Sequence, residues 1–264
     1  MTNDEPLISI RNLQTHYGSR QILKNINLDI YRGETMVILG RSGCGKSTLL
    51  RHIVGLAKPS SGEIIIKGND IAKMSEEEMA PVLRKIGMLF QGAALFNSMT
   101  VGENVAMPLR EHTKLEPSTV KIMMRMKLEQ VGLGGFDDFM PAQLSGGMKK
   151  RAGLARALAM DPEILFCDEP SAGLDPVVAM GIDQLINKLN QALKMTIVVV
   201  THELPSVIEI ADRIAMLHNG AVEAIGNWDE LRANSNPIVQ QFLNREADEE
   251  KIDREKYLRS LVDG

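Results

Sequence analysis

Apolar and polar residues alternate along two segments near the start of the chain, at positions 7–13 and 22–30. Such alternation predicts strands with one buried face. Short runs of consecutive apolar residues predict buried strands, and these runs lie at 36–39, 86–90, 164–167 and 195–200. Segments that favour helices alternate with them, at 47–54, 145–159, 177–193 and 203–211. This succession of strands and helices predicts an α/β fold.

Shorter elements complete the pattern. Residues 62–68 read as a strand between turn residues, and Ser75 followed by three glutamates predicts the start of a helix. Near the end of the chain the pattern predicts two short strands at 214–217 and 221–225, followed by short helices at 228–232 and 237–243.

The pattern changes between residues 101 and 140, which carry helical periodicity and few strand-forming residues. We therefore expect a helical subdomain, at about residues 95–160, inserted between the halves of the α/β core. Met123, Met124 and Met126 lie in this part of the chain. Methionines at helical spacing are explained by packing inside the subdomain, which we favour, or by an apolar face that binds a partner or a lipid.

The last segment, 244–264, is dense in charges of both signs and keeps few apolar residues. It is consistent with a solvated tail or with an amphipathic segment that docks on a partner subunit. The pattern favours neither alternative.

Residues 40–47 read Gly-Arg-Ser-Gly-Cys-Gly-Lys-Ser, which matches the phosphate-binding pattern G-x-x-x-x-G-K-[ST]. Glycines let successive backbone N–H groups point inward at an anion. Lys46 can reach the terminal phosphates, and the Ser47 hydroxyl can ligate Mg²⁺. A buried strand precedes the loop and a helix follows it, so the helix N-terminus adds positive charge beneath the phosphates. The motif predicts nucleotide binding.

Two further motifs carry chemistry. An apolar strand ends in Asp168 and Glu169. We expect this strand to run beside the phosphate-loop strand, with Asp168 on Mg²⁺ and Glu169 polarising the attacking water. Ser145, Gly146 and Gly147 open a helix and form a second anion site. That site is redundant for one ATP within one chain, but it is explained if it faces the ATP of a second copy.

Composition narrows the class of protein. With 44% hydrophobic and 24% charged residues, the 264-residue chain has the length and composition for a sizeable core. A net charge of −4 lacks the basic surplus of nucleic-acid-binding proteins, so we expect no nucleic-acid partner. The chain shows neither a membrane-spanning run nor a secretion signal, which predicts a cytoplasmic location. Cys44 and Cys167 both lie inside nucleotide motifs, where we expect reduced thiols.

Taken together and in this order, the motifs resemble those of the nucleotide-binding subunits of ABC transporters, over residues from about 7 to 242. The resemblance implies an α/β fold of the P-loop NTPase (RecA-like) type, with an antiparallel β subdomain and the inserted α-helical subdomain, all within a domain at 1–243. It implies that ATP and Mg²⁺ are bound and that ATP is hydrolysed.

The resemblance also implies roles for single residues. It implies that Tyr17 stacks on adenine, that Lys46, Glu169 and His202 act in hydrolysis, and that Gln91 links the γ-phosphate to a membrane subunit. The residues implied to hold Mg²⁺ are Ser47, Gln91 and Asp168. Those implied to contact ATP are Tyr17, Gly40, Arg41, Ser42, Gly43, Cys44, Gly45, Lys46, Ser47, Thr48, Gln91, Ser145, Gly146 and Gly147, the last three from a second copy.

One position departs from the family. Met148 follows the glycines where the family most often has Gln. The contacts of serine and glycine with phosphate do not depend on this side chain, so we expect activity to persist.

Three short segments of the sequence narrow the resemblance to one branch of this family. Residues 90–96, 108–113 and 144–152 resemble the ATPases of Mla phospholipid-trafficking systems, which keep outer-membrane lipid asymmetry in Gram-negative bacteria. This implies a homodimer of ATPases at the cytoplasmic face of the inner membrane, two integral-membrane permease subunits, a periplasmic lipid-binding subunit and a small cytoplasmic regulatory subunit. The alternative is the ATPase of an importer for amino acids or other small solutes, which shares every catalytic motif.

Overall fold

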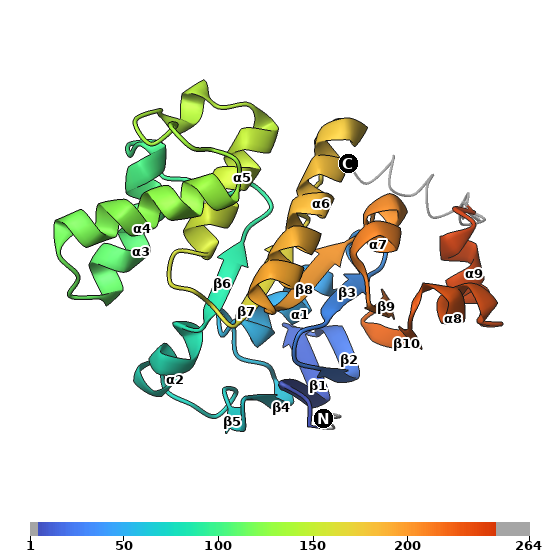
Figure 1. The fold of residues 1–264 in the computed structure, drawn as a ribbon. Helices are drawn as coiled ribbons and strands as arrows, with labels where there is room; N and C mark the ends of the chain where they lie inside the picture. The colour runs from blue at the N-terminus through green and yellow to red at the C-terminus, as the bar shows by residue number, and fades with distance from the viewer. Residues whose placement is uncertain (1–4, 247–264) are drawn as a thin grey trace, which may run out of the picture.

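A six-stranded sheet forms the centre of the computed structural model, which describes residues 5–246 (Figure 1). The strands are parallel except that the edge strand β10 is antiparallel to β9. Their order across the sheet is β10 (Ala221–Gly226), β9 (Arg213–His218), β3 (Thr35–Leu39), β8 (Thr196–Thr201), β7 (Ile164–Asp168) and β6 (Ile86–Leu89). The sheet confirms the predicted α/β fold.

One expectation about this sheet was wrong. Strand β7, which ends in Asp168, does not lie beside the phosphate-loop strand β3, because β8 is inserted between them. Each parallel connection crosses over through a helix, so the order of strands in the sheet need not follow their order in the chain. All these parallel strands still end at the same edge of the sheet.

A second sheet of four antiparallel strands covers one side of the core, in the order β2–β1–β4–β5. Two of its strands are longer than the alternating patterns predicted, because β1 continues to Tyr17 through register shifts and β2 starts at Arg20. The short β5 was not predicted. The bounds are β1 (Ile8–Tyr17), β2 (Arg20–Ile30), β4 (Ser61–Ile66) and β5 (Asn69–Asp70).

Alternation along β3 divides the interior into two cores. Met36 and Ile38 face the antiparallel sheet and helix α1 (Lys46–Ile53), whereas Val37 and Leu39 face the helices on the other side. All four side chains are fully buried. A strand covered on both faces reads as a continuous apolar run, which explains the pattern at 36–39.

Helices replace strands in the part of the chain where the pattern changed. In Figure 1 the two green helices α3 (Val101–His112) and α4 (Pro117–Gln130) lie away from the strands, and α5 (Gly146–Ala157) connects them to the sheet. A short 3-10 turn, η1 (Pro141–Gln143), precedes α5. Packing accounts for two of the methionines of α4, since Met124 is buried in the core and Met123 packs against it, whereas Met126 is exposed.

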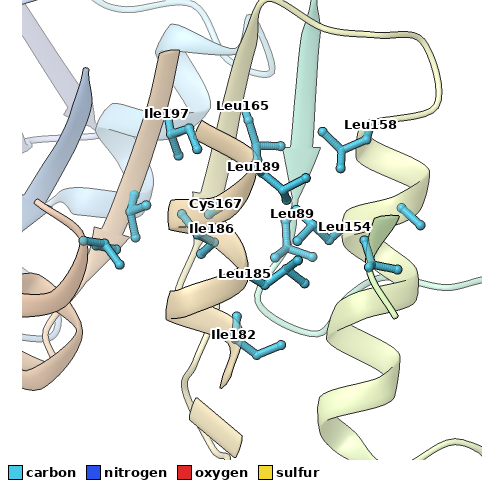
Figure 2. Packing of buried hydrophobic residues seen from close by; sticks show 14 of the residues in the cluster. Leu89, Leu154, Leu158, Leu165, Cys167, Ile182, Leu185, Ile186, Leu189 and Ile197 are labelled. Atoms are coloured by element: carbon cyan, nitrogen blue, oxygen red, sulfur yellow. The ribbon is translucent and has the colours of Figure 1, made fainter. Parts of the chain in front are cut away.

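Apolar side chains fix α5 against the sheet. Figure 2 shows Leu154 and Leu158 of the α5 segment facing Leu89 of β6, with residues of α6 (Pro176–Leu193) on the other side. Gly87 of β6 permits this close approach, because a Cβ atom there would collide with the backbone oxygen of Ala157. The position of α5 is therefore tightly coupled to that of the central sheet.

The remaining helices lie at the periphery. Ser75 caps α2 (Glu76–Leu83) through a capping box, as the serine and glutamates predicted. The others are α7 (Leu204–Ile210), α8 (Trp228–Ala233) and α9 (Pro237–Leu243). Of the segment 244–264, all but three residues lie outside the described part, so both alternatives for it stay open. Among the described residues, no helix has the length and apolar character needed to span a membrane.

Candidate nucleotide-binding site

The phosphate loop (residues 40–48) connects β3 to α1. Gly43 and Gly45 have φ angles of 76° and 110°, which glycine adopts without strain. Space at position 45 is also limited, because a Cβ atom there would lie 2.8 Å from Leu23 Cδ2 and would displace that side chain. The glycine spacing of the motif is therefore the spacing that this turn needs.

Lys46 points back into its own loop. Its side chain is buried, and Nζ donates hydrogen bonds to the backbone oxygens of Gly40 at 2.7 Å and Arg41 at 3.1 Å. The same ammonium lies 3.9 Å from Glu169 Oε1. A positive charge thus occupies the centre of the loop, where terminal phosphates would need it.

Ser47 and Asp168 meet although their strands are not neighbours. Ser47 Oγ lies 3.5 Å from Asp168 Oδ1, because β3 and β7 end at the same edge of the sheet. Burial raises the pKa of Asp168, and the nearby charge of Glu169 raises it further. A hydroxyl and a carboxylate oxygen are donors that Mg²⁺ prefers, so this pair fits that ion.

Glu169 is held at every polar atom of its carboxylate. His202 Nδ1 lies 2.8 Å from Oε1, and the Thr201 hydroxyl donates to Oε2 at 3.2 Å. Because an ionised carboxylate only accepts hydrogen bonds, the Nδ1 atom of His202 carries the proton in this contact. The Glu169 side chain is almost buried, whereas the His202 ring is half exposed.

A cleft of about 400 Å³ brings together most of the predicted ATP-site residues. Arg20 and Ile22 of β2 also line it, and sequence reasoning missed them because no motif marks residues on an ordinary strand. The predicted residues that line it are Tyr17, Ser42, Gly43, Gly45, Lys46, Ser47, Thr48, Gln91, Glu169 and His202.

Several predicted residues do not line this cleft. Arg41 lines a neighbouring cavity of about 430 Å³ together with His202, and Cys44 is a buried free thiol. Gly40 is buried behind the loop, where a Cβ atom would collide with Leu217 and Cys44. Asp168 is half-buried, and its contact with the phosphate loop is the one between Oδ1 and Ser47 Oγ.

Ser145, Gly146 and Gly147 are likewise not among the described residues that line the cleft. Ser145 caps α5 by accepting a hydrogen bond from the Met148 N–H at 3.3 Å. Gly147 packs closely on α6, because a Cβ atom there would lie 2.5 Å from Val178 Cγ1 and would force that side chain to move. Ser145 and Gly146 are exposed, so this part of the helix N-terminus is accessible to solvent and to a second chain.

A buried polar network behind the site was not predicted. Ser206 donates to Asp183 Oδ2 at 2.7 Å, and its hydroxyl lies 3.0 Å from that of Ser171. Burial raises the pKa of Asp183 to about 6. The three residues come from α6, α7 and the loop after Glu169, and their sequence positions are too far apart to reveal the contact.

Comparison with known proteins places this geometry in context. A family model described as "ABC transporter" matches residues 23–172. The chain is 45% identical over 242 residues to the intermembrane phospholipid transport system ATP-binding protein MlaF of Escherichia coli K12. This match covers 92% of this chain and 90% of that protein. The chain is also 43% identical over 237 residues to the probable ribonucleotide transport ATP-binding protein mkl of Mycobacterium leprae, over 90% of this chain and 68% of that protein.

Solved structures agree with these matches. The ATP-binding cassette MJ0796, determined as a dimer in a post-hydrolysis state with ADP and Pi, superposes with a TM-score of 0.77 at 35% identity. That match covers 83% of this chain and 98% of the other. The cbiO1 protein of Clostridium perfringens, part of the ABC transporter complex cbiONQ, gives a TM-score of 0.80 at 30% identity over 97% of this chain and 100% of its own.

Proposed function

Because this chain belongs to the ABC transporter family as an ATP-hydrolysing subunit, we propose that its ATP hydrolysis powers phospholipid trafficking between the inner and outer membranes. Such trafficking would maintain the lipid asymmetry of the outer membrane. The observation that supports phospholipid as the cargo is the 45% identity with MlaF over most of both chains. The second candidate is the ATPase of an importer for amino acids or other small solutes, which the relative named for ribonucleotide transport supports.

ATP enters with its phosphates on the phosphate loop. Backbone N–H groups of the loop and the N-terminus of α1 attract the negative charge. The Lys46 ammonium exchanges its bonds with Gly40 and Arg41 oxygens for bonds with the terminal phosphates. Tyr17 lies at the mouth of the cleft with 53% of its surface exposed, so a ring face is free to stack on adenine.

Ser47 and Asp168 are the residues that would hold Mg²⁺, with Gln91 of the same cleft as the third donor. When bound, the ion neutralises negative charge on the β- and γ-phosphates. The ionised form of Asp168 is the form that ligates, and the hydrogen bond from Ser47 together with the charges of Lys46 and Arg51 lowers its pKa against the effect of burial.

Glu169 and His202 act on the attacking water and the γ-phosphate. The Glu169 carboxylate accepts a hydrogen bond from that water and so orients it for in-line attack. His202 donates a hydrogen bond from Nδ1 to the Glu169 carboxylate, and its ring lines the same cleft as the phosphate loop. In the imidazolium form, with a second proton taken from solvent at Nε2, the ring stabilises the charge that develops on the γ-phosphate.

Two copies form the complete site. The cleft of one chain is lined by the phosphate loop but by none of Ser145, Gly146 and Gly147, of which Ser145 and Gly146 are exposed. A head-to-tail homodimer would bring these residues of one copy onto the ATP of the other. Each ATP would then be enclosed by two anion-binding helix N-termini.

The membrane partners have a candidate docking surface. A groove of about 620 Å³ lies between α2, β6, α3 and α5, and Phe90, Phe96 and Met107 line it. Phe90 directly precedes Gln91, so the groove and the phosphate-loop cleft share one loop. We assign the groove of each ATPase copy to one of two integral-membrane permease subunits, at the cytoplasmic face of the bacterial inner membrane. A periplasmic lipid-binding subunit and a small cytoplasmic regulatory subunit complete the proposed complex.

Purification from membranes tests the cargo. The tagged chain should copurify with integral-membrane subunits, and lipid extraction of the complex should recover phospholipid in amounts comparable to the complex itself. A K46A complex serves as the control for assembly without turnover. Recovery of a complex whose ATPase rate rises with an amino acid or nucleotide, and not with phospholipid, would overturn the phospholipid assignment in favour of the importer.

A further inference from the structure

Lys150 is a buried lysine on α5 that none of the sequence motifs accounts for. Only 6% of its surface is exposed, and Nζ donates a hydrogen bond to the backbone oxygen of Glu169 at 2.7 Å. Burial lowers the pKa of this ammonium, while the negative charges of Glu169, Asp168 and Glu203 counteract that effect. A buried charge is costly unless it is paired, so this contact is a specific feature of the fold.

The backbone that Lys150 contacts has an uncommon conformation. Glu169 has a φ angle of 49°, in the left-handed region that residues other than glycine seldom adopt. It also precedes Pro170, and a residue before proline is normally extended. Surrounding contacts must therefore hold this conformation.

Three backbone contacts hold it. The Glu169 N–H donates to the Val200 oxygen at 2.8 Å, which ties it to β8. Its own oxygen accepts from Lys150 and, at the longer distance of 3.4 Å, from the Ala172 N–H. Lys150 makes the shorter and charged of the two bonds at that oxygen, and charge-assisted bonds are the stronger ones.

Lys150 lies one helical turn after the glycines that begin α5. Gly146 and Lys150 are four residues apart, so they lie on the same face of one rigid helix. Leu154 and Leu158 anchor the other end of that helix segment in the core (Figure 2). A shift at the start of α5 is thus carried directly to the Lys150 ammonium.

We propose that Lys150 is a positioning residue that links the start of α5 to the backbone of Glu169 in the same chain. A phosphate bound at Ser145 and Gly147 would fix the position of α5. Lys150 would then orient the Glu169 carboxylate toward the ATP bound by the same chain. This inference rests on the proposed function, because it requires Glu169 to act in hydrolysis and a second copy to supply the phosphate at α5.

Steady-state ATP hydrolysis by the full chain tests the proposal. K150M keeps the length and apolar stem of the side chain and removes the donor. We expect kcat to fall roughly tenfold and KM for ATP to change by less than about twofold, because the interaction bears on chemistry rather than binding. K150R restores a donor and should recover a large part of kcat. K149M removes the neighbouring, half-buried ammonium of the same helix and should keep wild-type kcat.

Binding of a non-hydrolysable ATP analogue provides a second measurement, and K150M should bind it with wild-type affinity. Wild-type kcat in K150M, or a raised KM with unchanged kcat, overturns the proposal. If K150M does not fold, K150R and the donor-free K150L are compared below their unfolding midpoints, and a kcat in K150L equal to that of K150R and of wild type overturns it as well. The proposed function is tested separately: it is contradicted if E169Q continues to hydrolyse ATP.

Discussion

His202 Nδ1 lies 2.8 Å from Glu169 Oε1, and the two side chains line the same cleft as the phosphate loop. The contact orders the imidazole ring and determines which of its nitrogens carries a proton. Thr201, the residue before His202, holds the other oxygen of the same carboxylate. The end of β8 and the end of β7 therefore act as one unit, with each side chain oriented by the other.

This relationship predicts the effect of H202A. Loss of the ring removes both the orientation of Glu169 and the imidazole that stabilises the γ-phosphate, so we expect kcat for ATP hydrolysis to fall by about 10²-fold. ATP affinity, measured by equilibrium binding, should stay close to that of wild type. A variant with unchanged kcat would show that His202 takes no part in hydrolysis.

E169Q separates binding from chemistry. The amide keeps the shape of the carboxylate but accepts protons poorly, so ATP should still bind while turnover stops. The ATP-bound variant should accumulate as a closed dimer, which size-exclusion chromatography detects. E77Q, on the exposed surface of α2, makes the same chemical change away from the site and should behave as wild type. A monomeric E169Q that hydrolyses ATP normally contradicts the assigned role.

K46A tests the phosphate loop itself. Removing the ammonium deletes the central positive charge of the loop together with its bonds to the Gly40 and Arg41 oxygens. ATP hydrolysis should be abolished, as measured by phosphate release from the purified complex. The matched control is K24A, since Lys24 is an exposed lysine on β2. Near-normal turnover in K46A would refute the site assignment.

Asp183 predicts a dependence of stability on pH. Burial raises its pKa from 3.8 to about 6, with the charges of Glu203 and Glu209 adding to the rise and the Ser206 hydrogen bond opposing it. Between these two pH values the folded chain binds more protons than the unfolded chain, so the stability from Asp183 is lost as pH rises through 6. From pH 5 to pH 7 this loss amounts to about 1 kcal/mol.

D183N provides the comparison. Asparagine still accepts the hydrogen bond from Ser206 but carries no titrating charge. The free energy of unfolding in urea, wild type minus D183N, should therefore decrease between pH 5 and pH 7. A difference that is constant over this range, or that increases, contradicts the raised pKa of Asp183.

Local patterns predicted the elements well where one stretch of chain carries the whole signal. The run at 36–39, the glycines after it and the helix at 47–54 are contiguous, and each follows from its own residues. The same holds for Ser75, whose capping box is formed within four residues. Strand β5 was missed because two residues, Asn69 and Asp70, carry no periodicity, and they pair only because β4 lies beside them.

Tertiary structure decided the relationships between distant residues. The sequence by itself determined the phosphate loop, the acidic pair at 168–169 and the alternation of strands and helices, because each is encoded within a few neighbouring positions. Only the folded chain inserted β8 between β3 and β7, set Lys150 on the Glu169 oxygen and buried Asp183 beside Ser206. These contacts depend on how helices pack across the sheet, which no local pattern specifies.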